Sequence, residues 1–455
     1  SRAMENFDEY HSFLVVGLAR SGVAVSALLA SHGHAVSVYD DDPQAMARFA
    51  DSEVARDFKQ RVVTLSRQDA AVAATRSDCV VVSPGVPMEH PLIVAARGAG
   101  VPVIGEIEAA WHYTRARIVG VTGTNGKSTT VGVIGEILAA AGDDVVVAGN
   151  VGTPLADVLR ERDPHTLVLE LSSFQLDTID QFRVDVAVLL NVTPDHLDRY
   201  QRSMAKYAAS KARILNRAGE ETWYVYNAED AAAVRIASGH RGPVVPFSSM
   251  RSLDRGVFFD GGAVVRVWDG QRVEVIRRGE FTPAGIHNLE NALAAIAAVI
   301  PLGVDLASIR SALRAYRALP HRMEMVRVVD GVAYINDSKA TNVDAAIKSL
   351  MSVEGPVVVI LGGRDKDGDF AALVPQLGRV KRAVLIGEAS TAIRAALTGH
   401  CEMADAGDMR DAVNTARAAT APGDTVLLAP ACASFDMFKN YQDRGETFRA
   451  CVNAL

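Results

Sequence analysis

The stretch GVTGTNGKSTTVGVIGEIL, which begins at Gly120, combines residue types that bind phosphate. An apolar strand pattern leads into its glycine-rich turn and a helix pattern follows, so backbone amides and a helix N-terminus would face an anion. The Lys127 ammonium can reach the outer phosphates of a nucleotide, and the Ser128 hydroxyl can ligate Mg²⁺. The common spacing GxxxxGK[ST] fails, because Val121 stands where the first glycine is required. The stretch therefore predicts a nucleotide-binding loop of unusual form; a glycine turn with a chance Lys-Ser pair is the alternative interpretation.

Polar side chains also follow two other apolar runs. In LVLELSSFQLD, Glu170 lies near the end of a strand pattern, and in LLNVTPDHLDRY, Asp195 and His196 follow the end of another. The carboxyl ends of parallel strands meet at one edge of a sheet, so these residues should lie beside the loop. A carboxylate in that place is suited to hold Mg²⁺. For each residue taken alone, a satisfied buried acid or a structural histidine is the alternative.

The order of apolar runs predicts an α/β protein of three domains that would position these residues. We expect an N-terminal Rossmann-like domain over 1–105, a central domain with a mainly parallel sheet of the P-loop type over 106–318, and a C-terminal Rossmann-like domain over 319–455. Apolar runs without alternation indicate strands that are covered on both faces. The predicted elements include strands at Phe13–Val16, Ala35–Tyr39, Ile118–Val121, Val145–Val147, Leu167–Leu171, Val186–Val192 and Trp223–Tyr226, antiparallel edge strands within Val257–Ile276, a helix at HNLENALAAIAAVI, and C-terminal strands at VAYINDS, PVVVILGG, RAVLIGE and DTVLLAPA.

Composition narrows the class of protein. The 455 residues carry a formal net charge of −7 with no long basic run, so a nucleic-acid partner is not expected. The four cysteines are scattered, which favours reduced thiols and a cytoplasmic protein over a disulfide framework or zinc site. No apolar run approaches the ~20 residues of a membrane helix. The opening residues Ser1–Met4 do not resemble a signal peptide, and the first three of them look like a cloning remnant.

The motifs together resemble those of the muramyl ligases, ATP-dependent amide-bond ligases of peptidoglycan synthesis. The resemblance covers nearly the whole chain, and TGTNGKST is that family's own form of the nucleotide loop. Two of the matching stretches, NDSKATN and PACASFDMFKNYQDRGETF, resemble most closely those of the members that add D-glutamate. In the family's order the stretches are TGTNGKST, LELSSFQL, LNVTPDHLDRY, HNLENALAA, LPHRME, NDSKATN and PACASFDMFKNYQDRGETF.

The resemblance implies a reaction and its components. ATP, UDP-MurNAc-L-alanine and D-glutamate would give ADP, phosphate and the extended UDP-MurNAc dipeptide through an acyl phosphate. The first domain would hold the UDP part, the second ATP, and the third, which would close over both when ATP binds, would receive D-glutamate. Two Mg²⁺ sites, with Mn²⁺ as a substitute, and a carbamate formed from CO₂ on Lys211 are implied. So is a monomeric cytoplasmic enzyme that serves cell-wall biogenesis, cell shape and cell division.

The resemblance also carries over the roles of individual residues. Lys211 lies fifteen residues after His196, as in the family, whereas by itself it would be a surface lysine of a helix. Asn288 and Asn291 share a helix face, and their amides can donate to and accept from adenine; an N-cap is the alternative for Asn288. The implied catalytic residues are Lys127, Glu170, His196, Lys211 and Lys339, and the implied metal ligands are Ser128, Glu170, His196 and carbamylated Lys211. The implied ATP site comprises Thr124, Asn125, Gly126, Lys127, Ser128, Thr129, Thr130, Asn288, Asn291, Arg322 and Asp337. The implied substrate site comprises Arg20, Ser21, Asp40, Gly85 and Asn150 for the nucleotide sugar and Thr341, Lys366, Ser434 and Tyr441 for D-glutamate.

Three other functions compete with this one. Both end domains look Rossmann-like, which would suit an oxidoreductase, but in GLARSG the residue Ala19 replaces the second glycine of GxGxxG. A non-catalytic nucleotide-regulated binding protein would not need Lys127, Glu170, His196 and Lys211 together. A sister ligase that adds L-glutamate or another amino acid, or an enzyme like folylpolyglutamate synthase, stays open because chirality cannot be read from a few residues.

Overall fold

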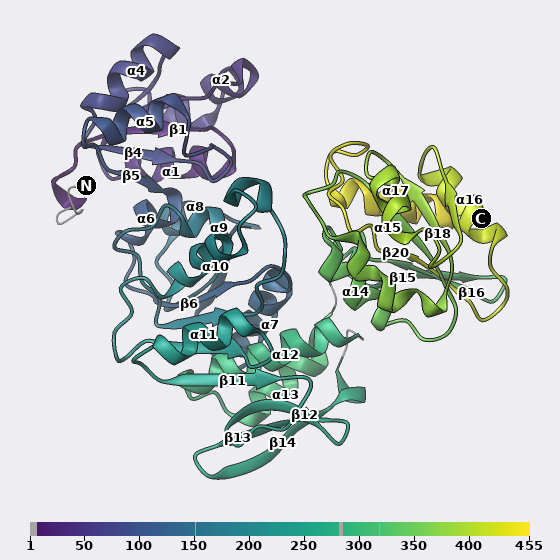
Figure 1. Ribbon diagram of the computed structural model, residues 1–455. Helices are drawn as coiled ribbons and strands as arrows, with labels where there is room; N and C mark the ends of the chain where they lie inside the picture. Colours follow the sequence, from purple (N-terminus) through teal and green to yellow (C-terminus); the bar gives the residue numbers. More distant parts are fainter. Residues whose placement is uncertain (1–6, 151, 282–284, 318) are drawn as a thin grey trace.

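A computed structural model describes residues 7–150, 152–281, 285–317 and 319–455, so the opening Ser1–Met4 lies outside the described residues. Each of the three predicted domains forms its own sheet with helices around it (Figure 1). The predicted boundaries at 105/106 and 318/319 fall between these sheets and stay predictions, residue 318 being outside the described ranges. Within the described ranges, no helix has the length and apolarity needed to cross a bilayer.

The first sheet is entirely parallel, in the order β3-β2-β1-β4-β5. Its central strand is apolar and buried from Phe13 to Val16, as a strand covered on both faces requires. The predicted Rossmann-like domain is therefore confirmed. The strands are β1 (Ser12–Val16), β2 (Ala35–Tyr39), β3 (Val62–Thr64), β4 (Cys79–Val82) and β5 (Val103–Gly105), and the helices are α1 (Arg20–Ser31), α2 (Pro43–Ala50), α3 (Glu53–Asp57), α4 (Arg67–Arg76) and α5 (Pro91–Gly98).

The central sheet has nine strands in the order β14-β13-β12-β11-β10-β9-β6-β8-β7. It is parallel from β7 to β12, and the last two strands add an antiparallel edge, as predicted for Val257–Ile276. The strands are β6 (Arg117–Thr122), β7 (Val145–Gly149), β8 (Thr166–Glu170), β9 (Val186–Leu189), β10 (Trp223–Asn227), β11 (Val244–Ser248), β12 (Gly256–Asp260), β13 (Ala263–Trp268) and β14 (Gln271–Arg277). The helices are α6 (Glu106–Trp111), α7 (Lys127–Ala140), α8 (Leu155–Glu161), α9 (Ser173–Leu176), α10 (Met204–Ala212), α11 (Ala231–Gly239), α12 (Ile286–Val299) and α13 (Leu306–Ala315).

The third sheet runs in the order β15-β16-β20-β17-β18-β19, and all its pairs except β15–β16 are parallel. Four strands match the predicted runs, whereas β15 and the short β19 were not foreseen. The strands are β15 (Glu324–Val329), β16 (Val332–Asn336), β17 (Val357–Gly362), β18 (Val380–Ile386), β19 (Met403–Asp405) and β20 (Thr425–Leu428), and the helices are α14 (Val343–Met351), α15 (Ser390–Leu397), α16 (Met409–Ala418) and α17 (Tyr441–Asn453).

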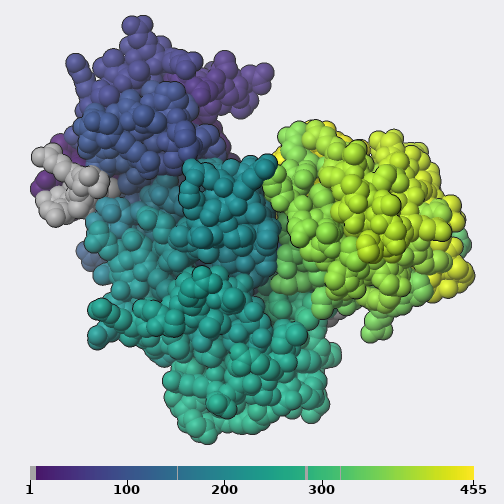
Figure 2. Space-filling model, in the orientation of Figure 1, coloured from purple at the N-terminus to yellow at the C-terminus, as the bar shows by residue number. Residues whose placement is uncertain are grey.

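The first and central domains share an apolar core, whereas the third domain has apolar cores of its own. One buried cluster runs without a break from the first domain, with Val15 and Leu28, into the central domain, with Leu169 and Leu189. The clusters of the third domain consist of residues after 319. The third domain nevertheless lies against the central one (Figure 2). Its contacts with the phosphate loop and with the end of β9 are polar.

Candidate active site

The glycine-rich loop lies between β6 and α7, as the sequence predicted. Gly126 has a left-handed backbone with φ of +89° and forms the N-cap of α7, so Lys127 is the first helical residue. The Lys127 ammonium donates to Gly123 O at 2.8 Å and to Thr124 O at 3.1 Å. Burial lowers the pKa of Lys127, against the opposing pull of Glu170 and Asp195. The Lys127 side chain thus folds back over its own loop, where its ammonium and the loop amides can bind an anion.

The adjacent strand β9 holds this loop in place. Asn191, two residues beyond β9, accepts the Thr124 amide with its carbonyl at 3.0 Å and the Asn125 amide with its side chain at 2.8 Å. Thr124 in turn donates its hydroxyl to Thr193 O at 3.0 Å. Asn191 was not predicted as a site residue, although its place just after an apolar strand was a usable signal. Thr129 and Thr130 are buried in the first turn of α7, below the loop.

The loop glycine at 126 offers a direct test of nucleotide binding. A Cβ on Gly126 would lie 2.2 Å from Asn291 Oδ1, on a backbone that side chains rarely adopt. We therefore expect Gly126→Ala to weaken ATP binding about 10- to 100-fold, because strain of ~1–3 kcal/mol must displace the loop or Asn291. Isothermal titration calorimetry would measure it. Gly142→Ala is the matched control, because Gly142 follows the same helix with φ of +84° and faces open space. It should lower thermal stability and leave ATP binding unchanged; equal ATP affinities of Gly126→Ala and wild type would contradict the assignment.

Glu170 ends β8, which pairs with β6. Its carboxylate is buried, 2% exposed, and accepts from the Asn150 side chain at 3.2 Å. The Asn150 amide also donates to Glu170 O at 2.9 Å, so the end of β7 and the end of β8 are tied together. Asn150, predicted as a substrate residue, therefore lies beside the predicted metal ligand and can orient it.

The segment after β9 places an acid and an imidazole side by side. Asp195 is buried and accepts from Lys366 Nζ of the third domain at 2.7 Å. Although burial raises it, the Lys366 and His196 charges hold the pKa of Asp195 below its usual value. Burial lowers the pKa of His196 to about 4, with Asp195 opposing and the Lys366 and Lys127 charges adding to the shift. The imidazole is therefore neutral near pH 7, the form that a metal ion requires.

Lys211, in α10, is 2% exposed, so the alternative of a surface lysine is wrong. Its Nζ donates to Gly123 O at 2.9 Å, the same carbonyl that Lys127 contacts, and lies 4.7 Å from the centre of the Tyr207 ring. Burial, and then the charge of Lys127, lower the pKa of Lys211 well below its usual value. The shift favours the neutral amine at this place beside the phosphate loop.

The residues predicted to bind adenine lie at the start of α12, which packs beside α7. The N-cap of α12 is Gly285, so the N-cap alternative for Asn288 is wrong. Asn291 Oδ1 accepts from the Thr130 hydroxyl at 3.4 Å, which brings this helix to the phosphate loop. Both ring nitrogens of buried His287 have no hydrogen-bond partner within the described ranges, which omit 282–284. Polar atoms of this kind are suited to a ligand.

The third domain brings its predicted residues to the same edge. Asp337 is fully buried, accepts from the Ser349 hydroxyl and the Met323 amide, and lies 3.9 Å from Arg322. Burial raises the pKa of Asp337, against the Arg322 charge. Lys339 Nζ lies 3.4 Å from Ser128 Oγ, across the domain boundary.

The residues predicted to bind D-glutamate are divided between loops of the third domain. Tyr441 begins α17, and its hydroxyl lies 3.4 Å from Lys339 Nζ. Ser434 is buried, and Thr341 follows Lys339 in one turn in which the Thr341 amide donates to Lys339 O at 2.9 Å. Lys366 is the member of this set that pairs with Asp195 of the central domain.

The predicted uridine-side residues lie at the carboxyl edge of the first sheet. Arg20 and Ser21 start α1, and Gly85 is exposed beyond β4. The Asp40 carboxylate accepts from the Leu18 amide at 2.7 Å and the Asp42 amide at 2.8 Å, so it shapes this edge. From the central domain, Arg199 donates to Pro84 O at 2.9 Å and Val86 O at 3.4 Å, on either side of Gly85; this link was not foreseen.

Comparisons with known proteins agree along the chain. Three family models match in order: "Mur ligase MurD-like, N-terminal domain" at 11–105, "Mur ligase middle domain" at 121–299 and "Mur ligase, glutamate ligase domain" at 321–432. Proteins of Pelotomaculum thermopropionicum and Geotalea uraniireducens, each named UDP-N-acetylmuramoylalanine--D-glutamate ligase, are 43% and 42% identical to it over 97% of both chains. In fold it is similar to a pseudomurein peptide ligase type C of Methanothermus fervidus, with a TM-score of 0.63, 18% identity and coverage of 98% and 99%. Three consecutive family models match, and relatives of this identity extend over nearly the full length, so the chain belongs to the Mur ligases, a family of ATP-dependent amide-bond-forming ligases.

Proposed function

We propose that this enzyme joins the amino group of D-glutamate to the terminal carboxyl group of UDP-MurNAc-L-alanine at the expense of ATP, as a step of peptidoglycan precursor synthesis. The observation that carries the proposal is the meeting of two sets of residues at one sheet edge. Lys127, Glu170 and Lys211 come from the central domain, and Lys339 reaches Ser128 from the third. The relatives that share 43% and 42% of its residues bear the corresponding name.

The chemistry explains why cations surround the loop. A carboxylate resists attack by an amine because an oxide leaving group is poor. An oxygen of the alanyl carboxylate attacks the γ-phosphorus of ATP, ADP leaves, and an acyl phosphate forms. The neutral amine of D-glutamate then attacks the acyl carbon, and phosphate leaves with the oxygen that came from the carboxylate. Lys127 and Lys339 stabilise the negative charge that moves with the phosphoryl group.

The residues of the site fit a divalent cation of the kind that accompanies nucleotides. Among the residues that the structure describes, no three acidic, histidine or cysteine side chains cluster as a preformed cage. Mg²⁺ in phosphoryl-transfer sites is instead held by one or two protein ligands together with substrate phosphates. Ser128 and buried Glu170 would hold one ion and His196 a second, with Mn²⁺ as a substitute. When bound, such ions neutralise phosphate charge.

A carbamate on Lys211 fits its surroundings. CO₂ reacts with a neutral amine, and burial and Lys127 lower the pKa of Lys211 well below its usual value. The resulting carbamate is an anion that Lys127 and a metal ion at His196 would stabilise. Lys211 would thus supply an anionic metal ligand, while the carbonyl of Gly123 fixes its side chain.

The amino acid substrate is tested by comparing the two enantiomers of glutamate. With UDP-MurNAc-L-alanine and Mg²⁺, we expect ADP release in a coupled assay to depend on D-glutamate and L-glutamate to support little turnover. Equal rates with both enantiomers would favour the alternative of a ligase for L-glutamate or another amino acid. The first domain, which matches the MurD-like N-terminal model, argues against an enzyme like folylpolyglutamate synthase.

We further propose that the enzyme acts as a monomer in the cytoplasm, where its nucleotide substrates are made, and that its product is used for cell-wall biogenesis during growth and division. Glu170, His196 and Lys211 all come from one chain, which supports a self-sufficient monomer. Sedimentation equilibrium would measure the mass directly. A stable dimer would contradict this part of the proposal.

A further inference from the structure

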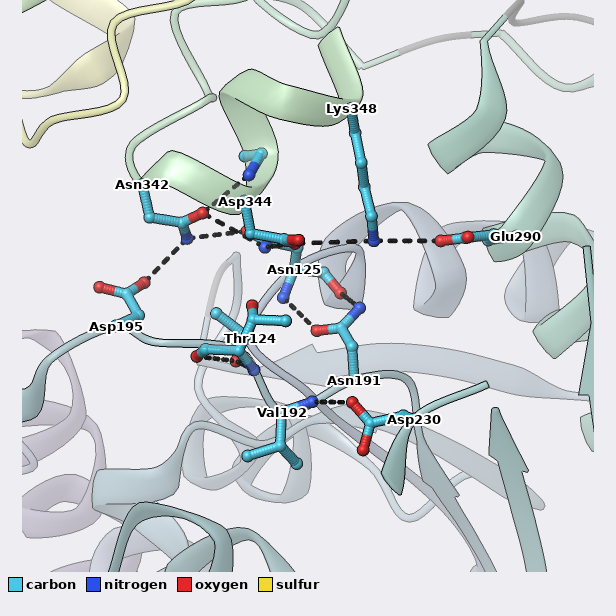
Figure 3. Close-up of polar contacts among 12 residues, drawn as sticks. Thr124, Asn125, Asn191, Val192, Asp195, Asp230, Glu290, Asn342, Asp344 and Lys348 are labelled. Atoms are coloured by element: carbon cyan, nitrogen blue, oxygen red, sulfur yellow. Dashed lines mark hydrogen bonds and ion pairs between the residues drawn. The ribbon is translucent and has the colours of Figure 1, made fainter. Parts of the chain in front are cut away.

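The start of α14 is fastened to the phosphate loop by a pair of asparagine side chains (Figure 3). Asn342 Nδ2 donates to Asn125 Oδ1 at 2.9 Å, and Asn125 Nδ2 lies 3.3 Å from Asn342 Oδ1. Asn342 Nδ2 also donates to Asp195 Oδ2 at 3.0 Å. Asn342 is 5% exposed and Asp195 is 7% exposed, so these bonds are shielded from water. One side chain of the third domain thereby contacts both the nucleotide loop and the segment of His196.

Two neighbouring contacts extend this attachment along the same helix. Asp344 Oδ2 accepts from Asn125 Nδ2 at 2.8 Å. One turn later, Lys348 Nζ lies 3.1 Å from Glu290 Oε2 of α12, the helix that carries Asn288 and Asn291. Helix α14 therefore spans from the phosphate loop to α12, the helix that carries the predicted adenine-binding residues (Figure 3).

The side chain of Asn342 has two separable tasks. Its oxygen accepts the Ala345 amide at 2.9 Å, which makes Asn342 the N-cap of α14, and it also lies 3.3 Å from Asn125 Nδ2. Its NH₂ group, in contrast, is directed entirely at central-domain oxygens, on Asn125 and Asp195. A cap needs only the oxygen, so the use of both hydrogens across the boundary is not explained by capping.

The location of Asn342 makes this attachment relevant to the reaction. Lys339 and Thr341 precede it in a tight turn, in which the Ala340 amide donates to Asp337 O at 2.9 Å and the Thr341 amide to Lys339 O at 2.9 Å. A turn this short transmits the position of Asn342 to Lys339, whose Nζ lies 3.4 Å from Ser128 Oγ. Fixing Asn342 on the loop therefore fixes the distance between a third-domain cation and the nucleotide phosphates.

We propose that Asn342 is a positioning residue that docks the third domain on the phosphate loop: its amide hydrogens, bound by Asn125 and Asp195, align Lys339 and the glutamate site with the ATP site. Its effect on turnover rests on the proposed function, whereas its effect on docking does not. A further contact between the two domains, Arg202 with Asp367 at 3.1 Å, is 78% and 36% exposed in its side chains, and exposed ion pairs contribute little.

The test uses two variants that keep the cap and remove the amide hydrogens that Asn125 and Asp195 accept. Asn342→Ser caps α14 with a hydroxyl that is too short to reach Asn125, and Asn342→Asp keeps size and cap but turns the donor into an acceptor that faces Asp195. We expect both to lower kcat/KM for D-glutamate about 10- to 100-fold, because buried partners lose their hydrogen bonds. Small-angle X-ray scattering should show a larger radius of gyration than for wild type, while the melting temperature stays near that of wild type. Arg202→Ala is the matched control and should change neither kcat/KM for D-glutamate nor the radius of gyration.

The kinetic measurement and the scattering measurement together distinguish a failure of the docking proposal from a failure of the proposed function. Wild-type scattering and wild-type kcat/KM in both Asn342→Ser and Asn342→Asp would overturn the proposal and leave Asn342 a cap. If wild type showed no ligase activity at all, the proposed function would fail, and the scattering comparison would still decide the docking role. A lowered melting temperature in the cap-retaining variants would count against docking as their main defect, and Asn342→Ala gives the size of the capping contribution for comparison.

Discussion

Lys211→Ala is expected to abolish measurable ADP release. The change removes the buried amine that donates to Gly123 O, and with it the carbamate that would complete the metal site beside His196. Loss of metal stabilisation worth several kcal/mol corresponds to a fall of about 10³-fold or more in kcat. The side chain is 2% exposed, so its removal leaves a space next to the phosphate loop. Acetate or formate should enter that space and partly restore turnover, which a coupled ADP assay would measure against anion concentration.

Two controls separate this chemistry from folding. Lys206→Ala removes an exposed lysine from the same helix and should leave kcat unchanged. Bicarbonate depletion should slow the wild type and have no effect on the acetate-rescued turnover of Lys211→Ala, because CO₂ reacts with the lysine that the variant lacks. Full activity of Lys211→Ala, or rescue by chloride as strong as that by acetate, would remove the carbamate from the mechanism.

Lys127→Ala is expected to lower kcat about 10²- to 10³-fold, the range for removing one preorganised group at a developing charge. The ammonium sits at the N-terminus of α7 and curls back over its own loop, where it can follow the outer phosphates. Its stabilisation grows as charge moves to the leaving ADP, so kcat should fall more than ATP affinity. Single-turnover kinetics and equilibrium nucleotide binding measure the two quantities separately.

The control for Lys127 lies further along the same helix. Glu136 is exposed on α7, and Glu136→Ala should leave both kcat and nucleotide affinity unchanged. Lys127→Ala should also raise the pKa of Lys211, because the Lys127 charge helps to lower it in the wild type. A Lys127→Ala enzyme that turns over at the wild-type rate would contradict the role assigned to the loop.

Much of the fold could be predicted because its strands are continuous apolar runs. The runs at β6, β8 and β9 are buried on both faces, and the order β9-β6-β8 brings the loop, Glu170 and His196 to one edge. This follows from the rule that ligands bind at the carboxyl ends of parallel strands. The largely exposed strand β15 and the three-residue strand β19 lack a continuous buried apolar run, which is why they were missed.

The remaining site residues depend on packing that a single sequence does not encode locally. Lys211 stands in a helix of mixed polarity, and nothing in MAKYAASKA distinguishes it from exposed Lys206. Its burial results from the packing of α10 against the loop. Asn342 lies in a stretch used to recognise the family, yet its bond to Asn125 exists only because two domains meet. Arg20, Ser21 and Gly85 lie at the edge of the first sheet, and their roles toward the nucleotide sugar stay predictions.

The central claim is that ATP activates the carboxyl group of the nucleotide sugar, and isotope transfer tests it most directly. UDP-MurNAc-L-alanine with ¹⁸O in both carboxylate oxygens would be turned over with ATP, Mg²⁺ and D-glutamate, and the released phosphate analysed by mass spectrometry. An acyl phosphate requires one ¹⁸O atom in each phosphate, because the bridging oxygen leaves with phosphorus. Phosphate without ¹⁸O, released at the same rate as the new amide, would contradict the account.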